Sequence, residues 1–199
     1  MTSPPRTVPG ESSSGHLPFQ YKPLCKPGQL ICGTGQTAVI TGWTVKQTVA
    51  KQLDKSEFAV IGQLYSSTRG ISLLIRNLLA NPHVRFVVVL NATQEDRNAG
   101  GCECLLDFFK QGFVEGESDT GRHCWVIRSR IAGYIDWEIP ATVLEQLRQS
   151  VIWQEVGSIA EAVAIVRKCA RGDFPWPPSW KSYAQRGSVP GEDSPGHLP

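Results

Sequence analysis

The feature that most constrains the fold is the apolar run from Val84 to Leu90. Valine and phenylalanine favour strands, so the run is read as a β-strand. Its apolar residues fall on both faces, which is typical of a strand covered by other elements on both sides. The run therefore predicts a central strand in a sheet that carries helices on both faces.

Other apolar runs alternate with segments whose apolar residues recur at helical spacing. The predicted strands are residues 37–41, 58–62, 84–90, 125–127 and 151–153, the last as an edge strand. The predicted helices are residues 45–53, a segment capped at Ser67 or Thr68 and stopped by Asn81-Pro82, and residues 102–111, 141–149 and 159–169. Strands separated by single helices predict an α/β fold: a Rossmann-like, doubly wound, mostly parallel sheet of about five strands.

The two ends of the chain differ in composition from its middle. Residues 1–29 are rich in Pro, Ser and Gly and residues 172–199 in Pro and Trp, so both are predicted to be disordered tails. Residues 30–171 are predicted to form one α/β ligand-binding domain. Residues 8–18 nearly recur as residues 189–199, a repeat too short to fold by itself. We interpret it as linker sequence, which suggests a module joined to something else.

Charge and hydropathy exclude several classes of partner. The formal net charge is +2 and the basic residues are scattered, so no nucleic-acid partner is expected. No apolar run approaches the ~20 residues that cross a bilayer, and the N-terminus lacks a signal-peptide core. No membrane association and a cytoplasmic location are therefore expected.

The six cysteines are expected to be free thiols in that compartment. Cys102 and Cys104 stand two positions apart on a predicted helix, so their side chains diverge. No Cys-x-x-Cys pair accompanies them, and no metal site is predicted.

Polar and small residues gather in the loops that follow the predicted strands. Ligands of open parallel sheets bind beyond the carboxyl ends of the strands, where residues 41–44, 62–70 and 91–101 are expected, joined by residues 131–136. A helix start with an arginine suits an anionic group, although the same residues would also make an ordinary capped helix. The predicted ligand-binding residues are Thr41, Trp43, Tyr65, Ser66, Thr68, Arg69, Gly70, Asn91, Asn98, Gly100 and Gly101. Of these, Trp43 and Tyr65 could flank a flat ring.

Catalytic residues stay unassigned. His123 and Cys124 are neighbours on a predicted strand, so their side chains point to opposite faces and do not form a nucleophilic pair. The chain also lacks the glycine fingerprint of a nicotinamide site and the Gly-Lys-Ser/Thr of a P-loop.

Three segments carry a family resemblance. Residues 38–44, 61–71 and 78–86 are similar to the soluble domain of the corrinoid-holding subunit of tetrahydromethanopterin S-methyltransferase. They more closely resemble the related amino-terminal module of cyanobacterial thymidylate-synthase-like proteins. Residues 134–136 and the helix after Pro140 extend the resemblance, which covers roughly residues 30–170.

The resemblance implies one-carbon chemistry: an accessory or ligand-binding domain for a pterin, folate or corrinoid-type ligand. Its expected partner is a thymidylate-synthase-like domain or a methyltransferase subunit. In the family a histidine after the central strand ligates cobalt, but residues 94–101 contain none. The cofactor therefore stays unassigned: tetrahydrofolate or another pterin is one candidate, and the missing histidine counts against cobalamin without closing a mode that needs no protein ligand.

Two alternatives remain beside that prediction. The first is a non-catalytic interaction module that docks through the tail holding Trp176 and Trp180. The second is a methyltransferase-type transferase that works together with another subunit or domain. No cysteine here has the Pro-Cys-His setting of thymidylate synthases, so the chain is not expected to make thymidylate alone.

Overall fold

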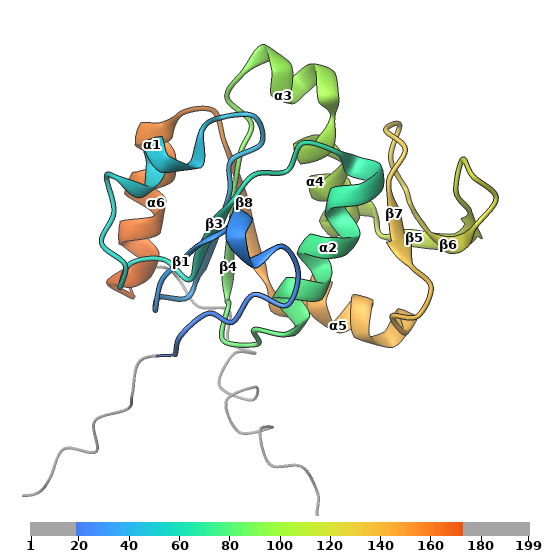
Figure 1. The fold of residues 1–199 in the computed structure, drawn as a ribbon, viewed down its shortest axis with the longest axis horizontal. Coiled ribbons are helices and arrows are strands. Elements are labelled where there is room, and N and C mark those ends of the chain that lie inside the picture. The colour runs from blue at the N-terminus through green and yellow to red at the C-terminus, as the bar shows by residue number, and fades with distance from the viewer. Residues whose placement is uncertain (1–18, 173–199) are drawn as a thin grey trace, which may run out of the picture.

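The computed structural model describes residues 19–172 and shows an α/β arrangement around one five-stranded sheet (Figure 1). The strands in spatial order are β1 (Ile31–Cys32), β3 (Val60–Gly62), β2 (Thr37–Ile40), β4 (Phe86–Leu90) and β8 (Ile152–Val156). The last four are parallel, whereas β1 runs antiparallel to β3. The sheet is thus mixed, and β8 is an edge strand as predicted.

Helices cover both faces of this sheet (Figure 1). On one face, α1 (Lys46–Ala50) and α6 (Ile159–Ala170) contribute buried side chains to a shared core. On the other face lie α2 (Ser67–Leu79), α4 (Gly101–Gln111) and α5 (Ala141–Ser150). The sheet is therefore the middle layer of three, as the alternation of strands and helices predicted.

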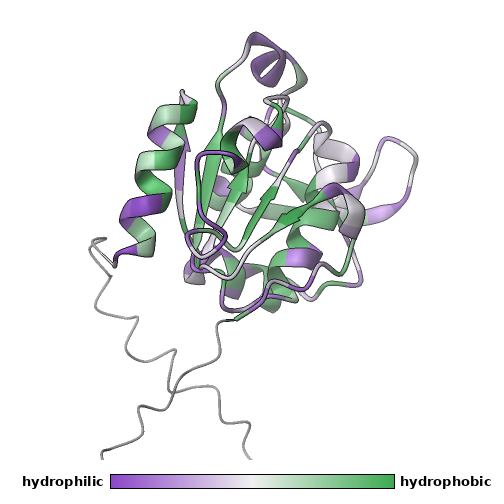
Figure 2. Ribbon diagram, turned by 60° about the vertical axis from the view of Figure 1, so that its left-hand side comes forward, coloured by the Kyte–Doolittle hydropathy of each residue, from purple (hydrophilic) through white to green (hydrophobic). Residues whose placement is uncertain are grey.

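The central position of β4 follows from its side chains. Val87 and Val89 join the core under α2 and α4, while Val88 and Leu90 join the core under α6. All of them are buried, and Figure 2 shows the strands of the sheet in the colour of hydrophobic residues. The strand predicted at residues 84–90 is confirmed over Phe86–Leu90.

A second, smaller sheet corrects the prediction for residues 125–127. It is antiparallel, in the order β5 (Phe113–Glu117), β6 (His123–Ile127) and β7 (Tyr134–Asp136). The predicted strand lies in β6 and so is not part of the main sheet. The turn between β5 and β6 is too short for a parallel pair, which needs a crossover of a dozen or more residues, so β6 pairs antiparallel with β5. The predicted loop at residues 131–136 likewise contains β7.

A helix not predicted from the sequence, α3 (Gln94–Ala99), lies within the predicted loop at residues 91–101. A capping box begins it: the Thr93 hydroxyl accepts from the Asp96 amide, and the Asp96 carboxylate accepts from the Thr93 amide. Its residues are almost all polar, so no apolar periodicity marks it.

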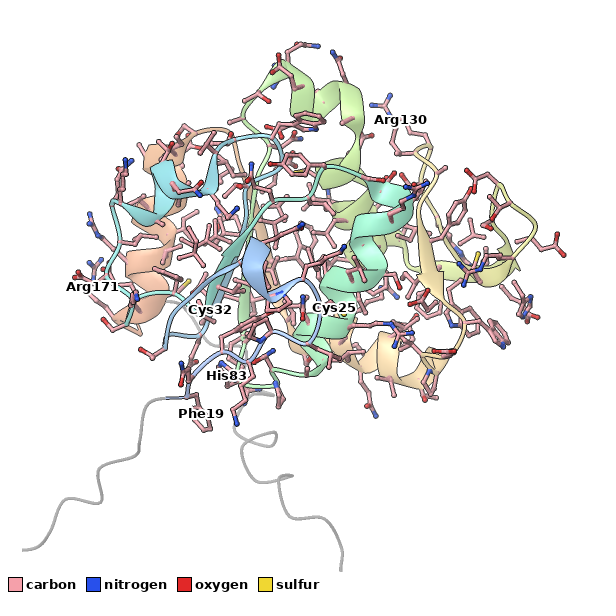
Figure 3. The ribbon with its side chains drawn as sticks, viewed as in Figure 1. Phe19, Cys25, Cys32, His83, Arg130 and Arg171 are labelled. Carbon is pink, nitrogen blue, oxygen red and sulfur yellow. The ribbon has the colours of Figure 1, made fainter. Side chains whose placement is uncertain are left out.

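Residues 21–30, here called the N-terminal strap, lie along α2. The side chain of Asn77 accepts hydrogen bonds from the amides of Leu24 and Cys25, both at 2.8 Å, and donates to the carbonyl of Cys25. One helical turn later, Asn81 makes the equivalent pair with the backbone of Lys22. Two asparagines thus hold the strap as a neighbouring strand would. Figure 3 shows Cys25 beside α2.

The strap corrects the predicted boundary of the domain. Tyr21 is only 3% exposed, and Phe19 stacks on His83 with ring centroids 5.5 Å apart (Figure 3). Residues 19–29 therefore pack against the domain instead of forming part of a disordered tail. Residues 1–18 and 173–199, with the rest of both predicted tails, lie outside the described residues. Within residues 19–172, no helix has the length and apolar character needed to cross a bilayer.

Candidate functional site

The three predicted loops meet at the carboxyl ends of the parallel strands. The side-chain amide of Gln63 donates to the carbonyl of Thr44 at 3.1 Å, which joins the loops after β3 and β2. The rings of Trp43 and Tyr65 meet edge to face at 5.0 Å. The loop after β4 joins them through a hydrogen bond from the Trp43 amide to Asp96. One rim of the sheet therefore carries all three.

The gap between β2 and β4 is closed by Asp96. The chain leaves β2 toward β3 on one side and returns to β4 on the other, which is where ligands of such sheets commonly bind. Here the carboxylate of Asp96 is 2% exposed and accepts from Trp43, Ala92 and Thr93 amides. The space predicted for a ligand at this point is occupied by a protein side chain.

A cavity of about 490 Å³ lies beside that point, under α2. Its walls are α2, the ends of β2 and β3, and the N-terminal strap. Most of the walls are apolar and include Leu30, Ile40, Leu64, Leu74 and Leu78. We call this the first cavity. Its size and apolar lining are typical of sites for small organic molecules.

The charged groups around the first cavity are all cationic. Lys26 comes from the strap, Lys46 from α1 and Arg69 from the first turn of α2. No Asp or Glu is among the described residues that line it. Within residues 19–172 the guanidinium of Arg69 has no ion pair, while Lys46 reaches only the Gln63 side chain, at 3.4 Å. An apolar ligand with an anionic group suits this arrangement.

Four of the predicted site residues line this cavity: Tyr65, Ser66, Arg69 and Gly70. Ser66 is also the helix cap, since its hydroxyl accepts from the Arg69 amide. Gly70 lets the side chain of Leu64 pack against the helix, because a β-carbon there would collide with it. The first turn of α2 is thus both a capped helix start and part of the cavity wall, so the two predictions made for it, a helix cap and a binding site, are compatible.

The remaining predicted residues do not line the first cavity: Thr41, Trp43, Thr68, Asn91, Asn98, Gly100 and Gly101. Thr41 is fully buried and reaches the Gly62 carbonyl at 3.5 Å. Asn91 donates to Glu155 on β8 at 2.9 Å, on the far side of β4. Thr68 lies on the opposite flank of α2, in a second cavity. Of the predicted ligand-binding residues, the structure therefore places around the first cavity those from the end of the loop after β3 and the first turn of α2, and not the others.

Several lining residues were not predicted. Lys26 and Gln29 belong to the strap, which reaches the site through hydrogen bonds to α2 across more than 50 positions of the chain. Sequence gives no signal for such a contact. Lys46 and Gln63, by contrast, stand in or directly beside predicted loops. A search for cations within two residues of those loops could have found Lys46.

The buried thiols are poor nucleophiles. Burial raises the pKa of Cys102 to about 12 and that of Cys104 to about 11. A thiol acts as a nucleophile only as thiolate, so neither is activated. No group of three His, Cys, Asp or Glu side chains in residues 19–172 is placed to hold a metal ion. The first cavity has no histidine among its described lining residues.

Comparison of the chain with protein-family models gives no match, and no curated protein matches it. The function is therefore inferred from the residues of the site together with the resemblance described above.

Proposed function

We propose that the chain is a cytoplasmic ligand-binding domain of one-carbon metabolism, and that it holds a flat, anionic molecule of the pterin or folate class in the first cavity. One observation carries the proposal. An apolar cavity of about 490 Å³ has three cations at its rim and no carboxylate among its described lining residues. That combination selects a ligand with an apolar body and a negative charge.

The two parts of such a ligand would meet different parts of the site. The ring would replace water against Leu64 and Leu74, with a gain of roughly 25 cal/mol for each Å² of apolar surface removed from water. Tyr65 is 50% exposed at the rim, where its ring can pack against that of the ligand. A carboxylate of the ligand would pair with Arg69, whose planar guanidinium suits two parallel hydrogen bonds.

The choice of pterin or folate over a corrinoid rests on the absence of an imidazole from the described lining. We also infer that the parallel strands form a doubly wound, Rossmann-like unit, because α1 and α6 cover one face and α2 and α4 the other. This is the fold implied by the resemblance to the tetrahydromethanopterin S-methyltransferase domain. A transferase step would need a second subunit or domain, since no group of catalytic residues accompanies the cavity among the described residues.

Calorimetry of the full chain with tetrahydrofolate, methylcobalamin and dUMP tests the proposal. Heat is expected with tetrahydrofolate alone. The Arg69→Gln variant should bind it about tenfold more weakly, the effect of losing one charge-assisted contact of about 1.4 kcal/mol. Arg97→Gln on α3 is the matched control, since Arg97 lines neither cavity. The proposal fails if none of the three compounds gives heat.

A second function, docking to a partner protein, is favoured by one surface. Trp43, Val45 and Tyr65 are 46%, 56% and 50% exposed. Exposed aromatic side chains commonly anchor interfaces. The partner proposed from the resemblance is a thymidylate-synthase-like domain or a methyltransferase subunit. Sedimentation of the chain with such a purified domain tests this: Trp43→Gln with Val45→Gln should abolish the complex, whereas deletion of residues 172–199 should leave it.

A further inference from the structure

The small antiparallel sheet has one closed edge and one open edge. It lies to one side of α2, apart from the main sheet (Figure 1). At the closed edge, the Asp136 amide on β7 donates to the Ser72 hydroxyl at 3.1 Å, so β7 and α2 form one wall. At the other edge, β5 has a neighbouring strand, β6, on one side only. The outer side of β5 can therefore accept a further strand.

The backbone groups of β5 alternate between these two sides. Just past the strand, the Ser118 amide donates to the Arg122 carbonyl, which fixes the phase of the alternation. In this phase Phe113, Glu115 and Glu117 direct their amides and carbonyls away from β6. None of these amides and carbonyls has a hydrogen-bond partner within residues 19–172. The edge thus presents a row of donors and acceptors at the spacing that an added strand needs.

The side chains on this edge are exposed to solvent. Val114 is 40% exposed, and the side chain of Glu115 is 65% exposed although it faces His123 on β6 at 3.5 Å. Glu117 is exposed as well and has no ion pair in the part of the chain described here. An aliphatic residue and two carboxylates are therefore open to a partner.

The charge of the edge is negative. β5 carries two carboxylates, Glu115 and Glu117, and no cation. The arginines of the same hairpin, Arg122 and Arg128, stand just outside the residues of β6 that pair with β5. Because β5 lies between β6 and any strand added at the edge, the added strand meets the glutamates first. Opposite charges directly across neighbouring strands stabilise a sheet.

A second copy of the chain does not suit this edge. In the register that pairs the whole of β5 with the β5 of a copy, antiparallel about its middle residue, Glu115 stands directly opposite its own equivalent. Like charges in that position are destabilising. A strand with cations at two positions two residues apart places one beside each glutamate instead. The residues between those cations fall on the opposite face, which on β5 holds Val114.

We propose that β5 is the docking edge for an extended segment of a partner protein in which basic and apolar residues alternate. The segment adds antiparallel to β5 and bonds to the outward amides and carbonyls of Phe113, Glu115 and Glu117. Its basic side chains pair with the two carboxylates, and its apolar side chains cover Val114. Neither this surface nor this partner involves the first cavity, so the inference does not rest on the proposed function.

Hydrogen exchange of the full chain, followed by NMR at each amide, tests the inference with a synthetic peptide. With an excess of acetyl-Lys-Val-Lys-Val-Lys-amide, the amides of Phe113, Glu115 and Glu117 should become protected. The amides of Val114 and Gly116 already face β6 and should change little. The matched peptide acetyl-Glu-Val-Glu-Val-Glu-amide should protect none of them.

Variants separate the role of the charges from that of the backbone. Glu115→Gln together with Glu117→Gln should weaken binding of the lysine peptide about tenfold, because two pairs of opposite charge are lost. Glu115→Lys together with Glu117→Lys should transfer the preference to the glutamate peptide. Glu115→Pro should abolish binding of either peptide while the hairpin still forms, since proline is tolerated where an edge amide faces solvent. Glu95→Gln on α3 is the control and should bind like the wild type.

Three results would overturn the inference. The first is exchange at the outward amides of β5 that the lysine peptide leaves unchanged. The second is equal protection by the lysine and glutamate peptides, which would mean that the edge does not select a basic partner. The third is self-association of the chain, seen by sedimentation, that Glu115→Pro abolishes, since a second copy would then occupy the edge. Should the proline variant not fold, the preference of the charge-reversed variant decides.

Discussion

The amide of Trp43 donates to the carboxylate of Asp96 at 2.6 Å, across the gap between the ends of β2 and β4. Two loops that are far apart in the sequence are joined there by one buried side chain. Gly42 makes the approach possible, because its φ of 54° is a conformation that favours glycine and a β-carbon on it would collide with Asp96. The ligand position usual in such sheets is thus used for structure, and the cavity lies under α2.

Replacement of Asp96 by alanine should destabilise the fold strongly. The carboxylate accepts from three backbone amides and from the Thr93 hydroxyl, and all these donors would lose their partner. The expected loss is on the order of 3 kcal/mol of unfolding free energy, measured by urea denaturation. Glu95→Ala, on the exposed side of the same helix, is the control. A loss below about 1 kcal/mol would show that water replaces the carboxylate.

The elements predicted from the sequence are those whose packing against the core fixes the spacing of their apolar residues. β4 carries apolar residues on both faces and α2 carries an apolar stripe, so each was visible without knowledge of the rest. By contrast, α3 is polar and depends on its capping box, and β5 has no buried residue. Such elements are set by local hydrogen bonds or by pairing with a neighbour, which a one-dimensional pattern does not record.

The same division applies to the candidate site. Arg69 and Tyr65 were predicted because they follow a strand, and the ends of parallel strands share a rim. Lys26 was not predicted. It reaches the cavity through the strap, so its position depends on tertiary contacts. No sequence pattern indicates that the side chain of Asp96 fills the space beyond the ends of β2 and β4.

Replacement of Asn77 by alanine should release the strap from α2. Its side chain makes three hydrogen bonds to the backbone of Leu24 and Cys25, and the site is nearly buried. Amide hydrogen exchange at these two residues should accelerate, with a cost of about 2 kcal/mol in unfolding free energy. Asn98→Ala, on the surface of α3, should leave both amides as protected as before. Unchanged exchange in the Asn77 variant would mean that Tyr21 and Asn81 hold the strap alone.

The thiols should differ sharply in reactivity. Cys25 is half-buried in the strap, whereas Cys102 and Cys104 are buried and burial raises the pKa of both. A short pulse of iodoacetamide at about pH 8 should therefore modify Cys25 first. Mass spectrometry should find the other two modified only after denaturation. Equal labelling of Cys25 and Cys102 in the native protein would contradict the burial of α4 against the sheet.

Stability should depend on pH through Asp136, which joins β7 to α2. Burial raises the pKa of its carboxyl, but hydrogen bonds from Ser72 and Arg76 and the charge of Arg76 outweigh burial, and the pKa lies below its ordinary value. The unfolded chain then binds the proton more readily, so this contribution is present above the ordinary Asp pKa of about 3.9. It is lost as the pH falls through the lower folded value.

The Asp136→Asn variant should consequently be less stable than the wild type at about pH 7, by at most about 1 kcal/mol because the pair is partly exposed and screened by solvent. The difference should shrink as the pH is lowered below about 4, since the wild type then loses the same charge. Urea denaturation of both proteins across this range measures it, with Glu117→Gln at an exposed position of β5 as the control. A difference that stays constant down to about pH 2 would mean that Asp136 acts through its shape and not through its charge, and that the wall between α2 and β7 does not depend on the ion pair with Arg76.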